Sequence, residues 1–204
     1  LKAEYPPEQG WEATPDANVQ KFITVFRRCT PCIAPSWATA VYSQDLLHSL
    51  VLLADTADLK SIFDTLRESH IHLSEGTALH YASAFGEVGE YGYALQVLQV
   101  RPKEFQGTDP FQWTCAAILR GSMRKPENYH ETPGIVAAFV QLGVKMDLLL
   151  YDVIMHNAMD AGDYTTAFKV FNALESHGLK PDKYTFSILL HGCAMQNEPT
   201  KFMA

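Results

Sequence analysis

The stretch that decides the fold runs from Leu148 to Asp182 and reads LLLYDVIMHNAMDAGDYTTAFKVFNALESHGLKPD. Its apolar residues recur twice with the 3.6-residue period of a helix, on either side of the turn Ala161-Gly162-Asp163. Gly178, followed by Lys-Pro-Asp, ends the second helix. The next segment, KYTFSILLHGC, begins the same pattern again after 35 residues. The recurrence predicts a solenoid, in which neighbouring helix pairs stack into one continuous core.

This unit resembles the pentatricopeptide repeat family over all 35 positions without a gap. The shared residues are Tyr151 at repeat position 4, Gly162 at 15, Ala167 at 20, Phe171 at 24 and the closing Gly-Leu-Lys-Pro-Asp at 178–182. The related tetratricopeptide pattern needs a Trp-x-x-Leu-Gly-x-x-Tyr first helix, which is absent here. The resemblance implies an all-α, right-handed α-solenoid of helix-turn-helix repeats.

Counting backwards from Leu148 in steps of about one repeat divides the rest of the chain into further repeats. The repeats are 40–74, 75–109, 110–147 and 148–182, followed by a partial repeat at 183–204. The unit 110–147 is three residues longer than the others, and we place the extra residues in the loop at 124–128, where an insertion costs little loop-closure entropy. Residues 1–39 form an N-terminal extension with one helix, either a cap or the second half of a degenerate repeat.

Composition agrees with this architecture. The chain has 204 residues, of which 47% are apolar, and no apolar run is long enough to span a membrane. It begins at Leu1 and stops within a repeat, so we expect a piece of a longer protein whose targeting peptide is not visible. The resemblance implies an organellar, and we expect a mitochondrial, protein.

The resemblance also places base recognition at repeat position 5 and at position 35. One base is then read per repeat by two or three side chains. The pairs at these positions are Gln44 with Ser74, Leu79 with Asp109, Thr114 with Asp147, and Asp152 with Asp182, followed by Ser187 alone. Thr114 with Asp147 matches a common family combination that is associated with a purine, usually guanine. Leu79 cannot form a hydrogen bond with a base, and Asp152 offers only acceptors.

The charges of the repeats disfavour a phosphate backbone. Residues 40–204 hold 12 Lys and Arg against 19 Asp and Glu, whereas nucleic-acid surfaces usually cluster positive charge. Position 13, where many family members have a Lys, holds no basic residue here. It is occupied by Leu52, Glu87, Ser122, Asp160 and Met195. One basic cluster, Arg120 with Arg124 and Lys125, is either a phosphate contact or a solvated loop.

Other residue patterns have structural explanations beside the chemical ones. Cys29 and Cys32 have the spacing of half a zinc site or of a redox pair, but no second pair completes a zinc site, and incidental cysteines fit as well. His48, His156 and His191 share repeat position 9 and would lie along one groove, too far apart to hold one metal. The repeat register also accounts for the aspartates and for the regular glycines, so neither a metal nuclease nor a phosphate loop is expected.

Two functions follow from these observations. The resemblance implies a non-catalytic protein that binds single-stranded RNA, a mitochondrial transcript or ribosomal RNA, on its concave surface and acts in transcript stability, processing or translation. The poor readout residues and the acidic charge favour the alternative, a protein-interaction scaffold or subunit of a mitochondrial ribosome or other organellar complex. No cofactor, metal or small-molecule substrate is expected in either case.

Overall fold

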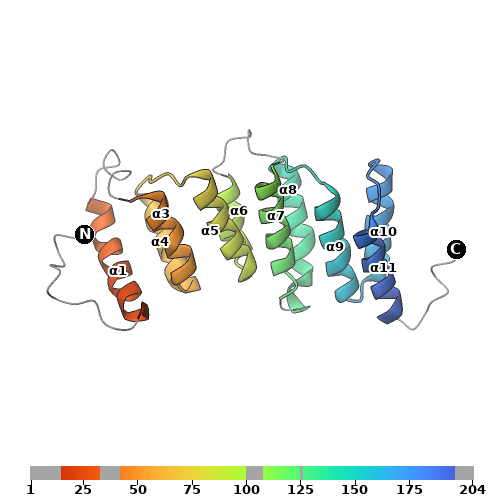
Figure 1. The fold of residues 1–204 in the computed structure, drawn as a ribbon, viewed down its shortest axis with the longest axis horizontal. Helices are drawn as coiled ribbons and strands as arrows, with labels where there is room; N and C mark the ends of the chain where they lie inside the picture. The colour runs from red at the N-terminus through yellow and green to blue at the C-terminus, as the bar shows by residue number, and fades with distance from the viewer. Residues whose placement is uncertain (1–14, 33–41, 100–107, 125, 196–204) are drawn as a thin grey trace. The chain divides into compact units, whose positions relative to one another are not determined.

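The computed structural model describes residues 15–32, 42–99, 108–124 and 126–195, and within these ranges the chain is entirely helical (Figure 1). Ten α-helices and two short 3-10 helices are found there, and the α-helices after the first follow one another as adjacent pairs. The described elements are α1 Pro15–Cys29, η1 Thr30–Cys32, α3 Gln44–Leu53, α4 Thr56–Glu68, α5 Glu75–Glu87, α6 Tyr91–Gln99, α7 Asp109–Gly121, η3 Pro126–Glu131, α8 Thr132–Gln141, α9 Leu148–Asp160, α10 Tyr164–Ser176 and α11 Lys183–Met195. The predicted all-α fold of paired helices is confirmed, and no described helix is long and apolar enough to cross a membrane.

Four of the five first helices among the described residues have the same length, and α3 is shorter, with 10 residues. Each of α5, α7, α9 and α11 spans 13 residues, and these helices begin at Glu75, Asp109, Leu148 and Lys183. The helix starts agree with the sequence register at 75, 148 and 183. The start of α7 lies one residue before the predicted repeat start at 110.

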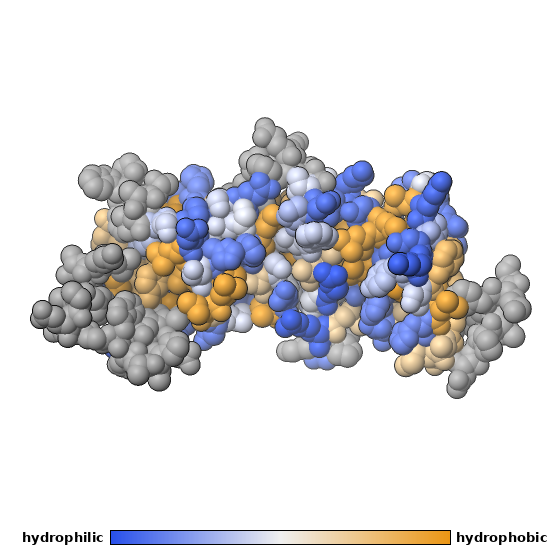
Figure 2. Space-filling model, viewed as in Figure 1, coloured by the Kyte–Doolittle hydropathy of each residue, from blue (hydrophilic) through white to orange (hydrophobic). Residues whose placement is uncertain are grey.

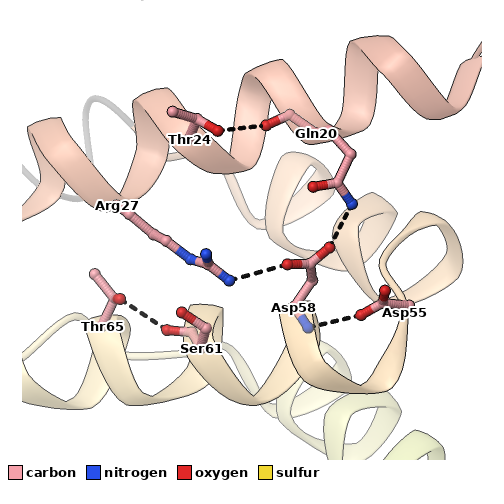
Figure 3. Close-up of polar contacts among 7 residues, drawn as sticks. All are labelled: Gln20, Thr24, Arg27, Asp55, Asp58, Ser61 and Thr65. Atoms are coloured by element: carbon pink, nitrogen blue, oxygen red, sulfur yellow. Dashed lines mark hydrogen bonds and ion pairs between the residues drawn. The ribbon is translucent and has the colours of Figure 1, made fainter.

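The chain divides into two compact units, residues 1–81 and 82–204. In the first unit, α1 packs on α4 through the carboxylate of Asp58, which is buried (Figure 3). Arg27 Nη2 lies 2.9 Å from Asp58 Oδ1, and Gln20 Nε2 donates to Oδ2 at 2.6 Å. Because the carboxylate is both charge-paired and hydrogen-bonded, these contacts offset the free-energy cost of removing it from water. Contact with the second helix of a pair is expected both for a cap and for the second half of a preceding repeat.

In the second unit, α9 is the most deeply packed helix. Residues 150–155 and 157–159 are all buried, against α7, α10 and α11. Asn157 fixes the end of α7, because its Nδ2 donates to Leu119 O at 2.8 Å and to Ser122 Oγ at 3.2 Å. Leu119 O also accepts from Ser122 N at 3.2 Å and from Ser122 Oγ at 2.7 Å, so the Asn157 amide joins α9 to the capped C-terminal end of α7.

The helices α5 and α7 touch backbone to backbone. A Cβ atom added to Gly121 would lie 1.8 Å from the carbonyl oxygen of Gly86, and one added to Gly86 would lie 2.7 Å from the Cα of Ile118. Any side chain at either position would force the two helices apart. The regular glycine spacing seen in the sequence thus serves helix packing at Gly86 and a turn at Gly89, where φ is +83°.

Helix ends in both units use a left-handed residue. After α10, Gly178 has φ 73°, and the next amide, that of Leu179, donates to Leu174 O at 3.2 Å, which closes the helix end. At the corresponding end of α4, the left-handed residue is His70, with φ 53°. Among the described residues it is the only one other than glycine with positive φ, and its Cβ makes that conformation costly.

We therefore expect His70→Gly and Gly178→Ala to change stability in opposite directions. His70→Gly should raise the free energy of unfolding by up to about 1 kcal/mol, because the strain at positive φ is removed. Gly178→Ala should lower it by about 1 kcal/mol for the same reason. Urea unfolding followed by circular dichroism measures both changes, and a loss of stability in His70→Gly would contradict the explanation.

Candidate nucleic-acid interface

The first helix α9 packs against α7, α10 and α11. This packing leaves one stripe of its residues on the side away from these neighbours. On α9 this stripe holds Leu149, Asp152, His156 and Asp160, spaced by three or four residues. His156 and Asp160 are exposed, and His156 Nδ1 lies 3.0 Å from Asp160 Oδ2. The stripe thus carries acidic and imidazole groups. On the face drawn in Figure 2, hydrophobic side chains reach the surface beside patches of hydrophilic ones.

Asp152 is the most unusual polar group on that stripe. Its side chain is only 3% exposed, and its Oδ1 has no hydrogen-bond partner among the described residues. Burial raises the pKa of Asp152 to about 6; the Thr185 hydroxyl lowers it, and the charges of Asp182 and Asp147 raise it further. A buried carboxylate with an open acceptor can take a hydrogen bond from a ligand amino group.

Three of the four residues at position 35 serve as helix caps. Asp147 Oδ1 accepts from Leu150 N at 3.0 Å, and Ser74 Oγ accepts from Thr77 N at 3.3 Å. Asp182 Oδ1 accepts from Tyr184 N at 2.7 Å and from Thr185 N at 3.0 Å, and these amide bonds lower the pKa of Asp182. A short polar residue at this place is therefore explained by capping before any base is considered.

Gln44 and Ser74 are brought together as the register predicts. Gln44 Oε1 accepts from Ser74 N at 2.7 Å, and Gln44 Nε2 donates to His72 O at 3.3 Å. The side chain of Gln44 thus holds the closing turn of its own repeat. Gln112 does the same two helix pairs further along, since its Nε2 donates to Lys145 O at 3.0 Å.

Leu79 and Thr114, like Asp152, are buried. Each side chain is only 6% exposed, and the Thr114 hydroxyl donates to Pro110 O at 2.9 Å, within its own helix. Asp109 is exposed but is the first residue of α7, and Thr108 occupies the N-cap position. Because α7 starts at Asp109, the residue in its fifth position is Trp113, whose side chain is 63% exposed.

The remaining candidates are at the end of the second unit. Ser187 is exposed on α11, as are Tyr184 and Phe186 on either side of the buried Thr185. Of the nine predicted readout residues, the structure brings Asp147, Asp152 and Asp182 close enough to influence one another's charge. Of the residues predicted at position 13, Ser122 is buried and the other four are exposed.

One of the three position-9 histidines contacts a histidine at another repeat position. His48 meets His80 of the next first helix, with ring centroids 4.0 Å apart and the rings edge to face. Burial and the nearby His48 lower the pKa of His80. The repeat register did not indicate this contact, because it puts the two side chains at different positions of their repeats. Within the described residues, no three His, Cys, Asp or Glu side chains converge to hold a metal ion, and Cys29 and Cys32 are not joined by a disulfide bond.

Paired helices, whose first members start 31 to 39 residues apart and which are closed by left-handed turns, define a helical repeat protein. Residues 146–195 match the PPR repeat family, a family of non-catalytic RNA-binding repeats. The chain is also 21% identical, over 94% of its length, to a chloroplastic pentatricopeptide repeat-containing protein of Arabidopsis thaliana. It spans 26% of that relative. The pentatricopeptide repeat resemblance drawn from the sequence is thus confirmed.

The buried carboxylate of Asp152 should make stability depend on pH. Its folded pKa of about 6 lies above the ordinary value of 3.8, so the folded state binds the proton more tightly than the unfolded chain. Stability should therefore fall as pH rises from about 4 to about 6 and then level off, with a total change of up to about 3 kcal/mol.

Asp152→Asn should remove this dependence and unfold at a higher temperature than the wild type at pH 8. Below about pH 4 the two proteins should unfold alike, because Asp152 is then protonated in both states. Glu175→Gln, which removes an exposed carboxylate from α10, is the matched control and should follow the wild type. Thermal unfolding across pH 3.5–8 measures the effect, and parallel wild-type and Asp152→Asn profiles would show that the carboxylate is not buried.

Proposed function

We propose that this chain is part of an organellar RNA-binding protein that holds single-stranded RNA along the exposed stripes of its first helices. The observation that carries the proposal is the match of residues 146–195 to an RNA-binding repeat family, together with α9 and α11, which present Asp152 and Ser187 at position 5. Residues at that place in successive repeats contact successive bases. The RNA would be a mitochondrial transcript or ribosomal RNA, and the function would lie in organellar gene expression.

Within this proposal the best reading unit is repeat 148–182. Asp152 and Asp182 offer only acceptors while ionised, so they would pair with a base amino group, as cytosine N4 or adenine N6 provides. The other predicted pairs are less suited, because the Gln44 amide and the Thr114 hydroxyl are engaged with backbone and Leu79 has no hydrogen-bonding group. Base reading would therefore be concentrated at the C-terminal end of the described residues.

The charge balance supports a second candidate, a scaffold for another organellar protein. The chain carries a net charge of −7, and Asp152 and Asp160 lie on the very stripe that would face phosphates. Like charges there reduce RNA affinity unless the contacts lie elsewhere. An acidic stripe instead suits a partner with Lys or Arg side chains.

RNA binding should be weak but measurable, with a moderate salt dependence. A labelled pool of random 20-nucleotide RNA should be retained by the chain at 50 mM salt and largely released at 200 mM, because few phosphate contacts are available. Filter binding measures this. No retention at 50 mM would reject the RNA proposal and leave the protein-scaffold function.

Asp152→Asn should change base preference at one nucleotide. The amide gains a donor, so selection from the random pool should shift away from bases that present an amino group at that position. Glu175→Gln removes the same charge from α10 and should leave the selected motif unchanged. Sequencing of the retained RNA compares the motifs, and identical motifs for all three proteins would show that Asp152 does not face a base.

A further inference from the structure

The exposed face of α7 combines one large aromatic ring with two cationic groups. Trp113 is 63% exposed, Arg120 is exposed, and the Arg124 side chain, just beyond the helix end, is 62% exposed. Trp113 and Arg120 are seven residues apart on α7, so both project from the same side of the helix axis, and Arg124 follows in the turn after the helix end. Ala117, between them in the sequence, has only a methyl side chain and is partly buried.

The register of α7 explains why an indole ring is in this place. Because the helix begins at Asp109 with Thr108 before it, residue 113 rather than 114 is the fifth residue. Thr114 is buried, and its hydroxyl donates a hydrogen bond to Pro110 O. Trp113 lies on the exposed side of the helix. A tryptophan that is mostly exposed contributes little burial to the fold, which leaves its flat surface available to a ligand.

The arginines favour an anionic ligand at this face. Arg124 Nη2 lies 3.7 Å from Glu87 Oε2, and both side chains are more than half exposed. Such a pair in water contributes at most about 1 kcal/mol, so a phosphate can displace the carboxylate. Arg120 lies about 10 Å along the helix axis from Trp113, a separation at which a strand stacked on the ring can reach it with its backbone.

We propose that Trp113, Arg120 and Arg124 form a sequence-independent binding site for single-stranded RNA, in which a base stacks on the indole and the two guanidinium groups contact phosphates. Every base has a π face, so stacking does not select among them. The proposal rests on the proposed RNA-binding function and refines it. Repeat 110–147, in which the sequence register predicts guanine recognition, would then bind RNA without discriminating among bases.

The experiment measures fluorescence anisotropy of labelled 16-nucleotide U, A and abasic RNA strands with the wild-type chain and four variants. Trp113→Ala should weaken binding of U and A strands at least about fivefold and equally for both, while Trp113→Phe retains most of the affinity. The abasic strand should bind wild type and Trp113→Ala alike. Val140→Ala, which shortens another exposed apolar side chain, on α8, is the matched control. The fourth variant, Thr114→Asn, should melt at a lower temperature but leave the ratio of U to A affinity unchanged.

Two further measurements separate stacking from charge. Arg120→Ala with Arg124→Ala should reduce the slope of log affinity against log salt by about 1.4, since each lost contact to a single strand removes about 0.7. Lys169→Ala, on α10, should leave that slope unchanged. RNA should quench tryptophan fluorescence in the wild type but not in Trp113→Phe; Trp11 and Trp37 lie outside the described residues.

The outcomes distinguish this site from the function itself. If the wild type binds RNA and Trp113→Ala binds it equally well, the stacking site is wrong while the RNA function stands. If the wild type binds none of the strands at 50 mM salt, the proposed function fails and the site fails with it. Loss of affinity in Trp113→Ala without quenching in the wild type would also reject stacking.

Discussion

The constraint on which this structure depends is that a first helix must bury three sides and can leave only one stripe open. In α9, residues 150–155 and 157–159 are buried against three neighbouring helices. Successive residues of an α-helix are rotated by about 100° from each other. A one-residue change in where a helix begins therefore decides which side chain enters the core and which one meets a ligand. Specificity in such a protein is set by helix starts as much as by residue types.

The fold was predictable because its signals are local. Turn glycines, the apolar period and the closing Lys-Pro-Asp are all contained in one 35-residue unit, and the starts of α5, α9 and α11 agree with the register counted from it. The start of α7 lies one residue before the repeat start counted from the sequence, and a count across a repeat with three extra residues fixes a helix start less closely than a count across 35. Thr108 and Asp109 are both acceptable caps, so local sequence did not decide between them. Only the packing of α7 on its neighbours did.

The candidate site was less predictable because it depends on contacts between repeats. Sequence places Gln44 at a readout position, but it cannot show that the amide spans to the backbone of His72 and Ser74. The contact of His48 with His80 joins two helices whose relative rotation is set by packing. Asp152 was recognisable as an acceptor from its residue type alone, whereas its burial and raised pKa follow from α11 lying against α9.

The net negative charge of the chain conflicts with RNA binding only if the stripe of every first helix must contribute equally to the affinity. The stripe of α9 is acidic and would lose affinity to phosphate repulsion, while that of α7 carries two arginines and an aromatic ring. Affinity in a solenoid is roughly a sum over repeats that contact only their neighbours, so one stripe can supply binding and another can supply discrimination. Asp152 would discriminate among bases, because a buried carboxylate left without a hydrogen bond strongly disfavours a base that has no donor. It needs a neighbouring stripe to hold the strand, and α7 is the adjacent first helix.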